Sequence, residues 1–153
     1  MTSRREDAYA TFRPRRSRYV SIGTAIAVVV VFGITAFTIP RGGVTGWSGV
    51  DSAAMFVFGL AVAGFLLRYA LVRATPTKEG LHVQNLIVSR DIAWAQVVNV
   101  QFGGGAPWLV LELDDTDTLA VMAVQRSDGD FANAEARRMA ALVEAHNRRA
   151  GND

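Results

Sequence analysis

The side chains that carry most protein chemistry are scarce in this chain of 153 residues. It has no cysteine and only two histidines, His82 and His146. Without cysteine the chain has no thiolate nucleophile, thiolate zinc site, iron–sulfur cluster or disulfide. Neither histidine has a second one at ligand spacing, which disfavours a zinc enzyme or a hydrolase that depends on histidine. We therefore predict no catalytic residue, no metal site and no cofactor, and a protein that is not an enzyme.

Two short segments resemble ligand-binding loops in composition. Asp114, Asp115 and Asp117 offer three carboxylates, but the glycine and glutamate that an EF-hand calcium loop needs at fixed positions are missing. We expect a solvated hairpin turn there. The run from Gly103 to Gly105 is not followed by the Gly-Lys-Ser/Thr of a phosphate loop and precedes a strand pattern. We expect it to be a flexible connection between strands.

The aromatic residues are the remaining candidates for a binding surface. Trp94 and Trp108 fit either the core, where large aromatics of a small domain usually lie, or a binding surface, where indoles are also common. Beside the glycine run, we expect Phe102 and Pro107 to be exposed and to form the rim of a protein contact. The predicted partner-binding residues are Phe102, Pro107 and Trp108. An edge strand would also offer unpaired backbone groups to an incoming segment.

Two long apolar segments dominate the first half of the chain. Tyr19–Ile39 and Ser52–Val72 each contain 21 residues, enough at about 1.5 Å per residue to cross about 30 Å of hydrocarbon. Arg68 lies near the end of the second segment, where its guanidinium can reach the headgroups. The first segment is longer than the apolar core of a secretory signal, which spans about 7 to 15 residues. We predict a transmembrane helical hairpin over residues 19–72.

The distribution of charge predicts how this hairpin is oriented. Residues 1–18 form a basic tail with six arginines and two acidic residues, whereas the glycine-rich link 40–51 has no net charge. By the positive-inside rule, we predict a multi-pass protein of the cell membrane with both termini in the cytoplasm. Aromatic and basic side chains near the ends of the spans should lie at the membrane interface. The predicted interface residues are Arg13, Arg15, Arg16, Arg18, Tyr19, Trp47, Arg68 and Tyr69.

The second half of the chain has the pattern of a separate cytoplasmic domain over residues 74–149, followed by a tail at 150–153. Short apolar runs between turn residues predict strands, after an extended segment at Thr75–Thr77, over residues 81–84, 87–92, 97–102, 108–113 and 119–124. A closing helix carries one apolar stripe formed by Met139, Leu142, Val143 and His146. We predict an α+β, mostly β, domain: an antiparallel barrel capped by its C-terminal helix.

Several short motifs of this half resemble a known family. They are Thr75–Leu81, Asn85-Leu86, Ile92–Trp94, Gly105–Trp108 and Met122–Gln125. With the closing helix and the two preceding helices, they resemble the bacterial pleckstrin-homology (PH) domain of small membrane proteins of the actinobacterial type. The resemblance implies a curved antiparallel barrel attached to a helical hairpin. It implies no catalytic residue.

The charges of the domain bear on what it binds. From residue 74 onward it has seven basic and eleven acidic residues, a net charge of −4. PH domains that bind phosphoinositides use a basic cluster on their first hairpin, where this chain has only Lys78 and His82. An acidic domain is poorly suited to nucleic acid or anionic headgroups, so we expect no nucleic-acid partner.

Two functions fit these features. The first is a non-enzymatic membrane protein whose PH-like domain docks another membrane or cytoplasmic protein. Such a protein could be an accessory subunit of a large membrane complex, such as a respiratory or transport assembly. The alternative is a PH protein that senses or handles membrane lipids. The expected partners are therefore the phospholipid membrane and a second protein.

Overall fold

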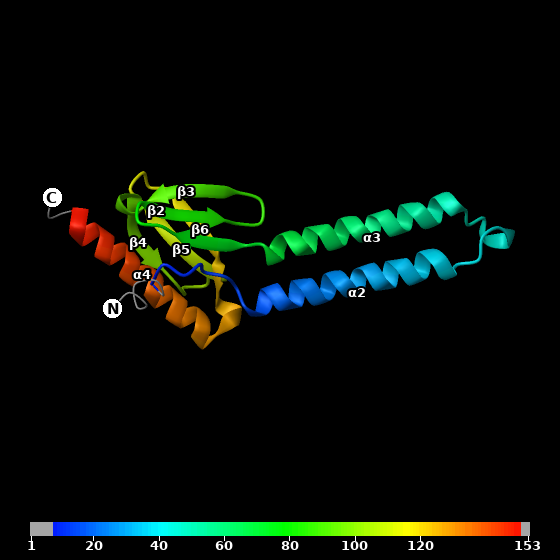
Figure 1. The fold of residues 1–153 in the computed structure, drawn as a ribbon, viewed down its shortest axis with the longest axis horizontal. Helices are drawn as coiled ribbons and strands as arrows, with labels where there is room; N and C mark the ends of the chain where they lie inside the picture. Colours follow the sequence, from blue (N-terminus) through cyan, green and yellow to red (C-terminus); the bar gives the residue numbers. More distant parts are fainter. Residues whose placement is uncertain (1–7, 151–153) are drawn as a thin grey trace. The chain divides into compact units, whose positions relative to one another are not determined.

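The computed structural model describes residues 8–150, which form two compact units. One unit, called here the hairpin, contains residues 17–70. The other, called here the domain, contains residues 71–150 together with residues 8–16. Figure 1 shows the elements of both units in chain order.

The hairpin consists of α2 (Arg16–Thr38) and α3 (Gly49–Ala70), joined by a link that includes the 3-10 turn η1 (Gly43–Thr45). Both predicted helices are present, and both are long and apolar enough to cross a membrane. The start of α3 is fixed by a reciprocal pair of side chains. The Asp51 backbone N–H donates to Ser48 Oγ at 3.2 Å, and the Ser48 N–H donates to the Asp51 carboxylate at 2.8 Å. This is the arrangement of a capping box, with Asp in place of Glu.

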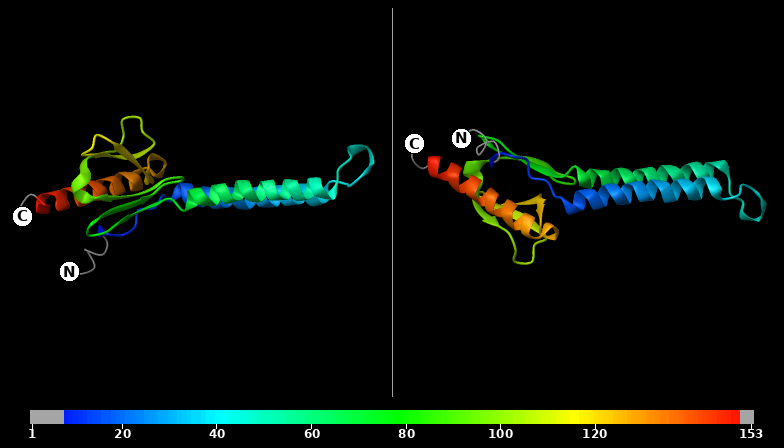
Figure 2. Two further views of the ribbon diagram at one scale, coloured as in Figure 1. Left: turned by 90° about the horizontal axis from the view of Figure 1, so that it is seen from above. Right: turned by 60° about the horizontal axis from the view of Figure 1, so that its bottom comes forward.

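The two helices of the hairpin run antiparallel and side by side in both views of Figure 2. The residues that they bury are small: Ser21, Ala25 and Ala36 on α2, and Ser52, Gly59 and Ala63 on α3. At the closest approach, a Cβ atom added to Gly59 would lie 2.5 Å from Cβ of Phe32. Small residues at such contacts let two helix backbones approach closely, as they do in membrane helix pairs.

The first sheet of the domain has the order β1-β2-β3, all antiparallel, with β1 (Arg73–Pro76), β2 (Gly80–Gln84) and β3 (Ser89–Ala93). The predicted extended segment near Pro76 is thus a strand. A residue from the other end of the chain continues the sheet beyond β1. Phe12 and Ala74 exchange two backbone hydrogen bonds, of 2.8 and 3.1 Å.

The second sheet has the order β4-β5-β6, with β4 (Val97–Gln101), β5 (Trp108–Leu113) and β6 (Thr118–Gln125). The 3-10 turn η2 (Trp94–Gln96) leads into it, and η3 (Arg126–Asp128) leads from it to α4 (Asp130–Ala150). Asn85, after β2, joins the two sheets. Its side chain donates to the Ala120 carbonyl at 2.7 Å and accepts the Met122 N–H at 3.1 Å, so it pairs with β6 as a strand would.

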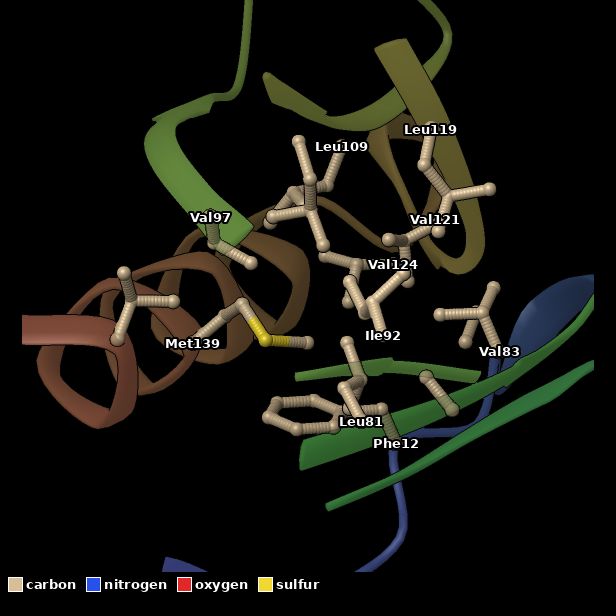
Figure 3. Packing of buried hydrophobic residues seen from close by; sticks show 14 of the residues in the cluster. Phe12, Leu81, Val83, Ile92, Val97, Leu109, Leu119, Val121, Val124 and Met139 are labelled. Atoms are coloured by element: carbon tan, nitrogen blue, oxygen red, sulfur yellow. The ribbon is translucent and has the colours of Figure 1, made fainter. Parts of the chain in front are cut away.

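The core lies between the two sheets and α4, as Figure 3 shows. Met139 of α4 lies between Val97 and Leu81 in this view. The predicted apolar stripe of the last helix is confirmed, because Met139, Leu142 and Val143 are all buried. Two three-stranded antiparallel sheets capped by a C-terminal helix, following a helical hairpin, confirm the predicted PH-like fold.

The segment before α2 differs from its predicted description as a tail. Phe12 is fully buried in the domain core, and Pro14 is buried as well. The guanidinium of Arg138 on α4 lies 3.6 Å from the Phe12 ring centroid and donates to the carbonyls of Ala8 and Ala10. Residues 8–16 are therefore a structural part of the domain. One aromatic residue among arginines has no periodicity that would reveal this from sequence.

Candidate functional site

The three predicted partner-binding residues flank the glycine loop, but they are not equally accessible. Pro107 is exposed, whereas Trp108 is half-buried at the start of β5. Phe102 was expected to be exposed, but it is half-buried and packs against the core. The loop turns the chain through Gly103, Gly104 and Gly105, all at positive φ, a conformation that glycine adopts without strain. Of the three, only Pro107 is fully exposed.

A groove between β4 and α4 is a better candidate for a binding site. Its volume is about 490 Å³. Its apolar lining residues are Val98 and Val100 from β4 and Ala140 and Val143 from α4. Its polar lining residues are Asn99, Glu144, Asn147 and Arg148. The Glu144 and Arg148 side chains are 3.5 Å apart and exposed, so this ion pair is weak and accessible.

The groove follows the free edge of the second sheet. β4 is the first strand in the order β4-β5-β6, so one side of its backbone has no strand beside it within the sheet. Amide side chains occupy part of that backbone instead. Asn147 Nδ2 donates to the Val97 carbonyl at 3.0 Å, and Asn99 Oδ1 accepts the Val100 N–H at 2.9 Å. An edge covered only by side chains is the kind of strand to which another segment can add.

Val98 is the most exposed large apolar residue of this groove, at 66%. The cause is a bulge between Val97 and Asn99 in the pairing of β4 with β5. Regular alternation would place Val98, Val100 and Phe102 on one face. The bulge instead turns Val97 into the core and leaves Val98 outside. The sequence contains no turn residue that marks this bulge, so sequence reasoning did not identify Val98.

Each of the two histidines makes contacts with neighbouring residues that give it a structural role. His82 lies on the surface: it pairs across strands with Asp91, and their Nδ1 and Oδ1 atoms are 2.5 Å apart. His146, the last residue of the predicted apolar stripe, is half-buried at the rim of the core. Its ring stacks on buried Trp94 at 4.9 Å, Nδ1 lies 2.8 Å from the Leu142 carbonyl, and Nε2 lies 2.9 Å from the Tyr9 hydroxyl. Nδ1 must therefore carry a proton, which leaves Nε2 to accept from Tyr9 in the neutral ring.

The aspartate cluster forms a hairpin turn, as predicted, and it links the two sheets. Arg90 on β3 pairs with Asp117 at 2.5 Å and with Asp115 at 3.7 Å. The hydrogen bond from Arg90, followed by that from the Thr118 N–H, lowers the pKa of Asp117. Within residues 8–150, no group of three or more His, Asp and Glu side chains is placed to hold a metal ion.

The predicted membrane-interface residues fall in both units. Most of them are exposed, while Trp47 and Tyr69 are half-buried; the exposed ones are Arg13, Arg15, Arg16, Arg18, Tyr19 and Arg68. The backbone N–H groups of Arg15 and Arg16 each donate to the buried Asp128 carboxylate at 2.8 Å. The Arg15 guanidinium also lies 3.8 Å from the Phe131 ring centroid. The backbone of Arg15 and Arg16 is thus hydrogen-bonded to the rest of the domain, whereas their charged side chains lie at the surface.

Comparison with known proteins agrees with this architecture. Residues 72–141 match the family described as Bacterial PH domain, and the chain belongs to this family. It is similar to the uncharacterized protein Rv1417 of Mycobacterium tuberculosis and the uncharacterized protein Mb1452 of Mycobacterium bovis. In each case the identity is 34% over 136 residues, which is 88% of this chain and 88% of the relative. No solved structure matches the chain.

Proposed function

We propose that this protein is a non-enzymatic membrane protein whose PH-like domain docks an extended segment of a partner protein in the groove between β4 and α4. The hairpin spans the cell membrane, and both ends of the chain and the domain lie in the cytoplasm. The protein would then serve as an accessory subunit of a larger membrane complex, such as a respiratory or transport assembly. The exposed edge of β4 beside an apolar groove is the observation that carries the proposal.

The exposed surface of the hairpin supports the membrane part. Large apolar side chains point outward along both helices, among them Ile34 and Phe37 on α2 and Phe58 and Phe65 on α3, which are 59–67% exposed. In water such a surface would be strongly unfavourable, whereas hydrocarbon covers it without cost. The +4 charge of residues 1–18 favours a cytoplasmic position for that end.

An extended occupant suits the groove because of what β4 offers. The Val97 carbonyl and the Val100 N–H are the kinds of backbone groups that pair with a neighbouring strand. The amide side chains that now meet them are replaceable, because Asn99 and Asn147 are exposed. An incoming strand would take over these hydrogen bonds and place apolar side chains against Val98 and Val143.

The charges of the domain favour a protein over a lipid headgroup. The first hairpin of the domain carries Lys78 next to Glu79, and His82 is already paired with Asp91. A multiply charged headgroup needs several cations directed at one point. This arrangement makes the lipid-sensing alternative the weaker account, and the experiment below includes it as an outcome.

Site-specific photocrosslinking in native membranes tests the docking site. A benzophenone side chain at exposed Ala140 should give one discrete protein adduct of the full chain. The adduct should be lost with Val98→Asp and retained with the matched exposed control Ser89→Asp on the first sheet. Circular dichroism must show that both variants fold. Equal adducts from both variants, or adducts of lipid mass at Ala140, would contradict the docking proposal.

A further inference from the structure

The turn between β2 and β3 carries apolar side chains where turns normally carry polar ones. Its residues Leu86, Ile87 and Val88 are followed directly by β3, and the Asn85 N–H donates to the Val88 carbonyl at 2.9 Å. Ile87 is 81% exposed and Val88 is 59% exposed. Turns are usually built from Gly, Pro, Asn, Asp and Ser. Consecutive exposed apolar residues at the tip of a hairpin therefore need an apolar environment to cover them.

The strand register shows where this turn lies within the domain. Gln84 and Ser89, which bracket the turn, pair with each other, and Gln84 also pairs with Arg73 at the start of β1. The turn and the first residues of β1 are thus at the same end of the first sheet, as Figure 1 shows. Leu71 precedes this strand and is 58% exposed, so it adds a third apolar side chain at this end.

The chain itself ties this end of the sheet to the end of α3. Only Leu71 and Val72 separate Ala70, the last residue of α3, from Arg73. A step of three residues reaches at most about 10 Å, whatever the arrangement of the two units. If α3 spans the membrane, the start of β1 must therefore lie at the membrane surface from which α3 emerges.

Basic side chains occupy the same end of the sheet. Phe12 pairs antiparallel with Ala74, so Arg13 follows toward the end at which Arg73 lies, and both arginines are exposed. Two acidic residues, Asp115 and Asp117, are paired with Arg90. A third, Asp128, lies beside the same segment and accepts the backbone N–H groups of Arg15 and Arg16. Arginines beside exposed apolar residues are the usual composition of a surface that contacts anionic lipid.

We infer that Ile87 and Val88, together with Leu71, insert into the lipid leaflet from which α3 emerges. The occupant of this surface is the bilayer itself: acyl chains around the apolar tip and headgroup phosphates around Arg13 and Arg73. This inference rests on the proposed membrane anchoring of the hairpin. The domain is already tied to the leaflet by the short connection from α3 to β1. The apolar turn gives it a second contact, and two contacts fix the orientation of the domain on the membrane.

Electron paramagnetic resonance of the full chain tests this inference, because the chain has no cysteine to compete for a label. Single spin labels are placed at Ile87, at Val57 in the middle of α3, and at Val98, which is 66% exposed. The protein is reconstituted in vesicles of phosphatidylcholine and phosphatidylglycerol. Collisions with oxygen, which is enriched in hydrocarbon, are compared with collisions with a water-soluble nickel complex.

We expect oxygen collisions to exceed nickel collisions at Ile87 and Val57, and the reverse at Val98. A label at Ile87 that favours nickel while Val57 favours oxygen would overturn the insertion and leave the membrane anchoring intact. Nickel preference at Val57 would instead overturn the anchoring. A label at Ile87 that is shielded from both reagents would show that protein, and not lipid, covers the turn, and would also overturn the inference.

Discussion

The hairpin and the domain use the same apolar residue types in opposite ways. In the hairpin, the large side chains such as Val31, Phe37 and Phe58 are exposed, and the buried positions hold Ala, Ser and Gly. In the domain, Leu109, Leu111 and Val121 are fully buried between the sheets. The difference agrees with the proposed membrane environment of the hairpin. A water-facing fold hides its large apolar groups, whereas helices in hydrocarbon gain nothing by hiding them and associate through close backbone contact.

The domain is also less continuous in sequence than the hairpin. Residues 8–16 precede the hairpin in the sequence, whereas the rest of the domain follows it. Phe12 of this first segment is nevertheless buried in the domain core. The domain can complete its core only when both of its segments are present. The hairpin is therefore an insertion into the domain, and any test of domain stability requires the full chain.

The largest expected effect comes from removing the aromatic residue that the N-terminal segment adds to the core. Phe12→Ala should lower the free energy of unfolding of the domain by about 3–5 kcal/mol, because it leaves a cavity where the side chain is fully buried. Urea denaturation of the full chain in detergent, followed by tryptophan fluorescence, measures this. Arg13→Ala, at an exposed neighbour, is the control and should change little. Equal small effects would show that residues 8–16 are a tail after all.

A second prediction concerns the contact between the two helices. Gly59→Leu should destabilise the hairpin by about 1–3 kcal/mol, because a Cβ atom at Gly59 would lie 2.5 Å from Cβ of Phe32. The distance between spin labels at the exposed residues Val31 and Leu60, measured by double electron–electron resonance, should increase. Gly64→Leu is the matched control, since a Cβ atom there meets nothing within 4 Å. If both substitutions leave the distance unchanged, the close helix contact is absent.

Much of this architecture could be predicted from the sequence, and the exceptions have physical causes. The length of the apolar segments predicted α2 and α3, and the stripe at Met139, Leu142 and Val143 predicted the helix that covers the core. Periodicity could not reveal Phe12, because a single buried residue has no repeat. The candidate groove was missed for a related reason: the bulge that exposes Val98 interrupts the alternation from which burial is inferred.

The smallest expected effect concerns the exposed ion pair between Arg90 and Asp117, which joins the two sheets. The hydrogen bond from Arg90 lowers the pKa of Asp117, so this pair contributes stability above the ordinary aspartate pKa of about 3.9 and loses it as the pH falls through the lowered value. Arg90→Gln should raise the pKa of Asp117 toward its ordinary value, as followed by NMR titration of the carboxyl carbon. Lys78→Gln, on the turn between β1 and β2, should leave it unchanged. An unaltered pKa of Asp117 in the Arg90→Gln variant would show that the ion pair between Arg90 and Asp117 does not persist in solution.

The central claim has two parts: the exposed apolar surface of the hairpin faces lipid, and the domain lies in the cytoplasm. Single cysteines in place of Ser48, in the link between the helices, and Thr118, on β6, test it in intact cells with a membrane-impermeant maleimide. We expect labelling at Ser48 in intact cells, and labelling at Thr118 only after the cells are permeabilised. Labelling at Thr118 with protection at Ser48 would reverse the orientation, and equal labelling of both in intact cells would contradict a hairpin that spans the membrane.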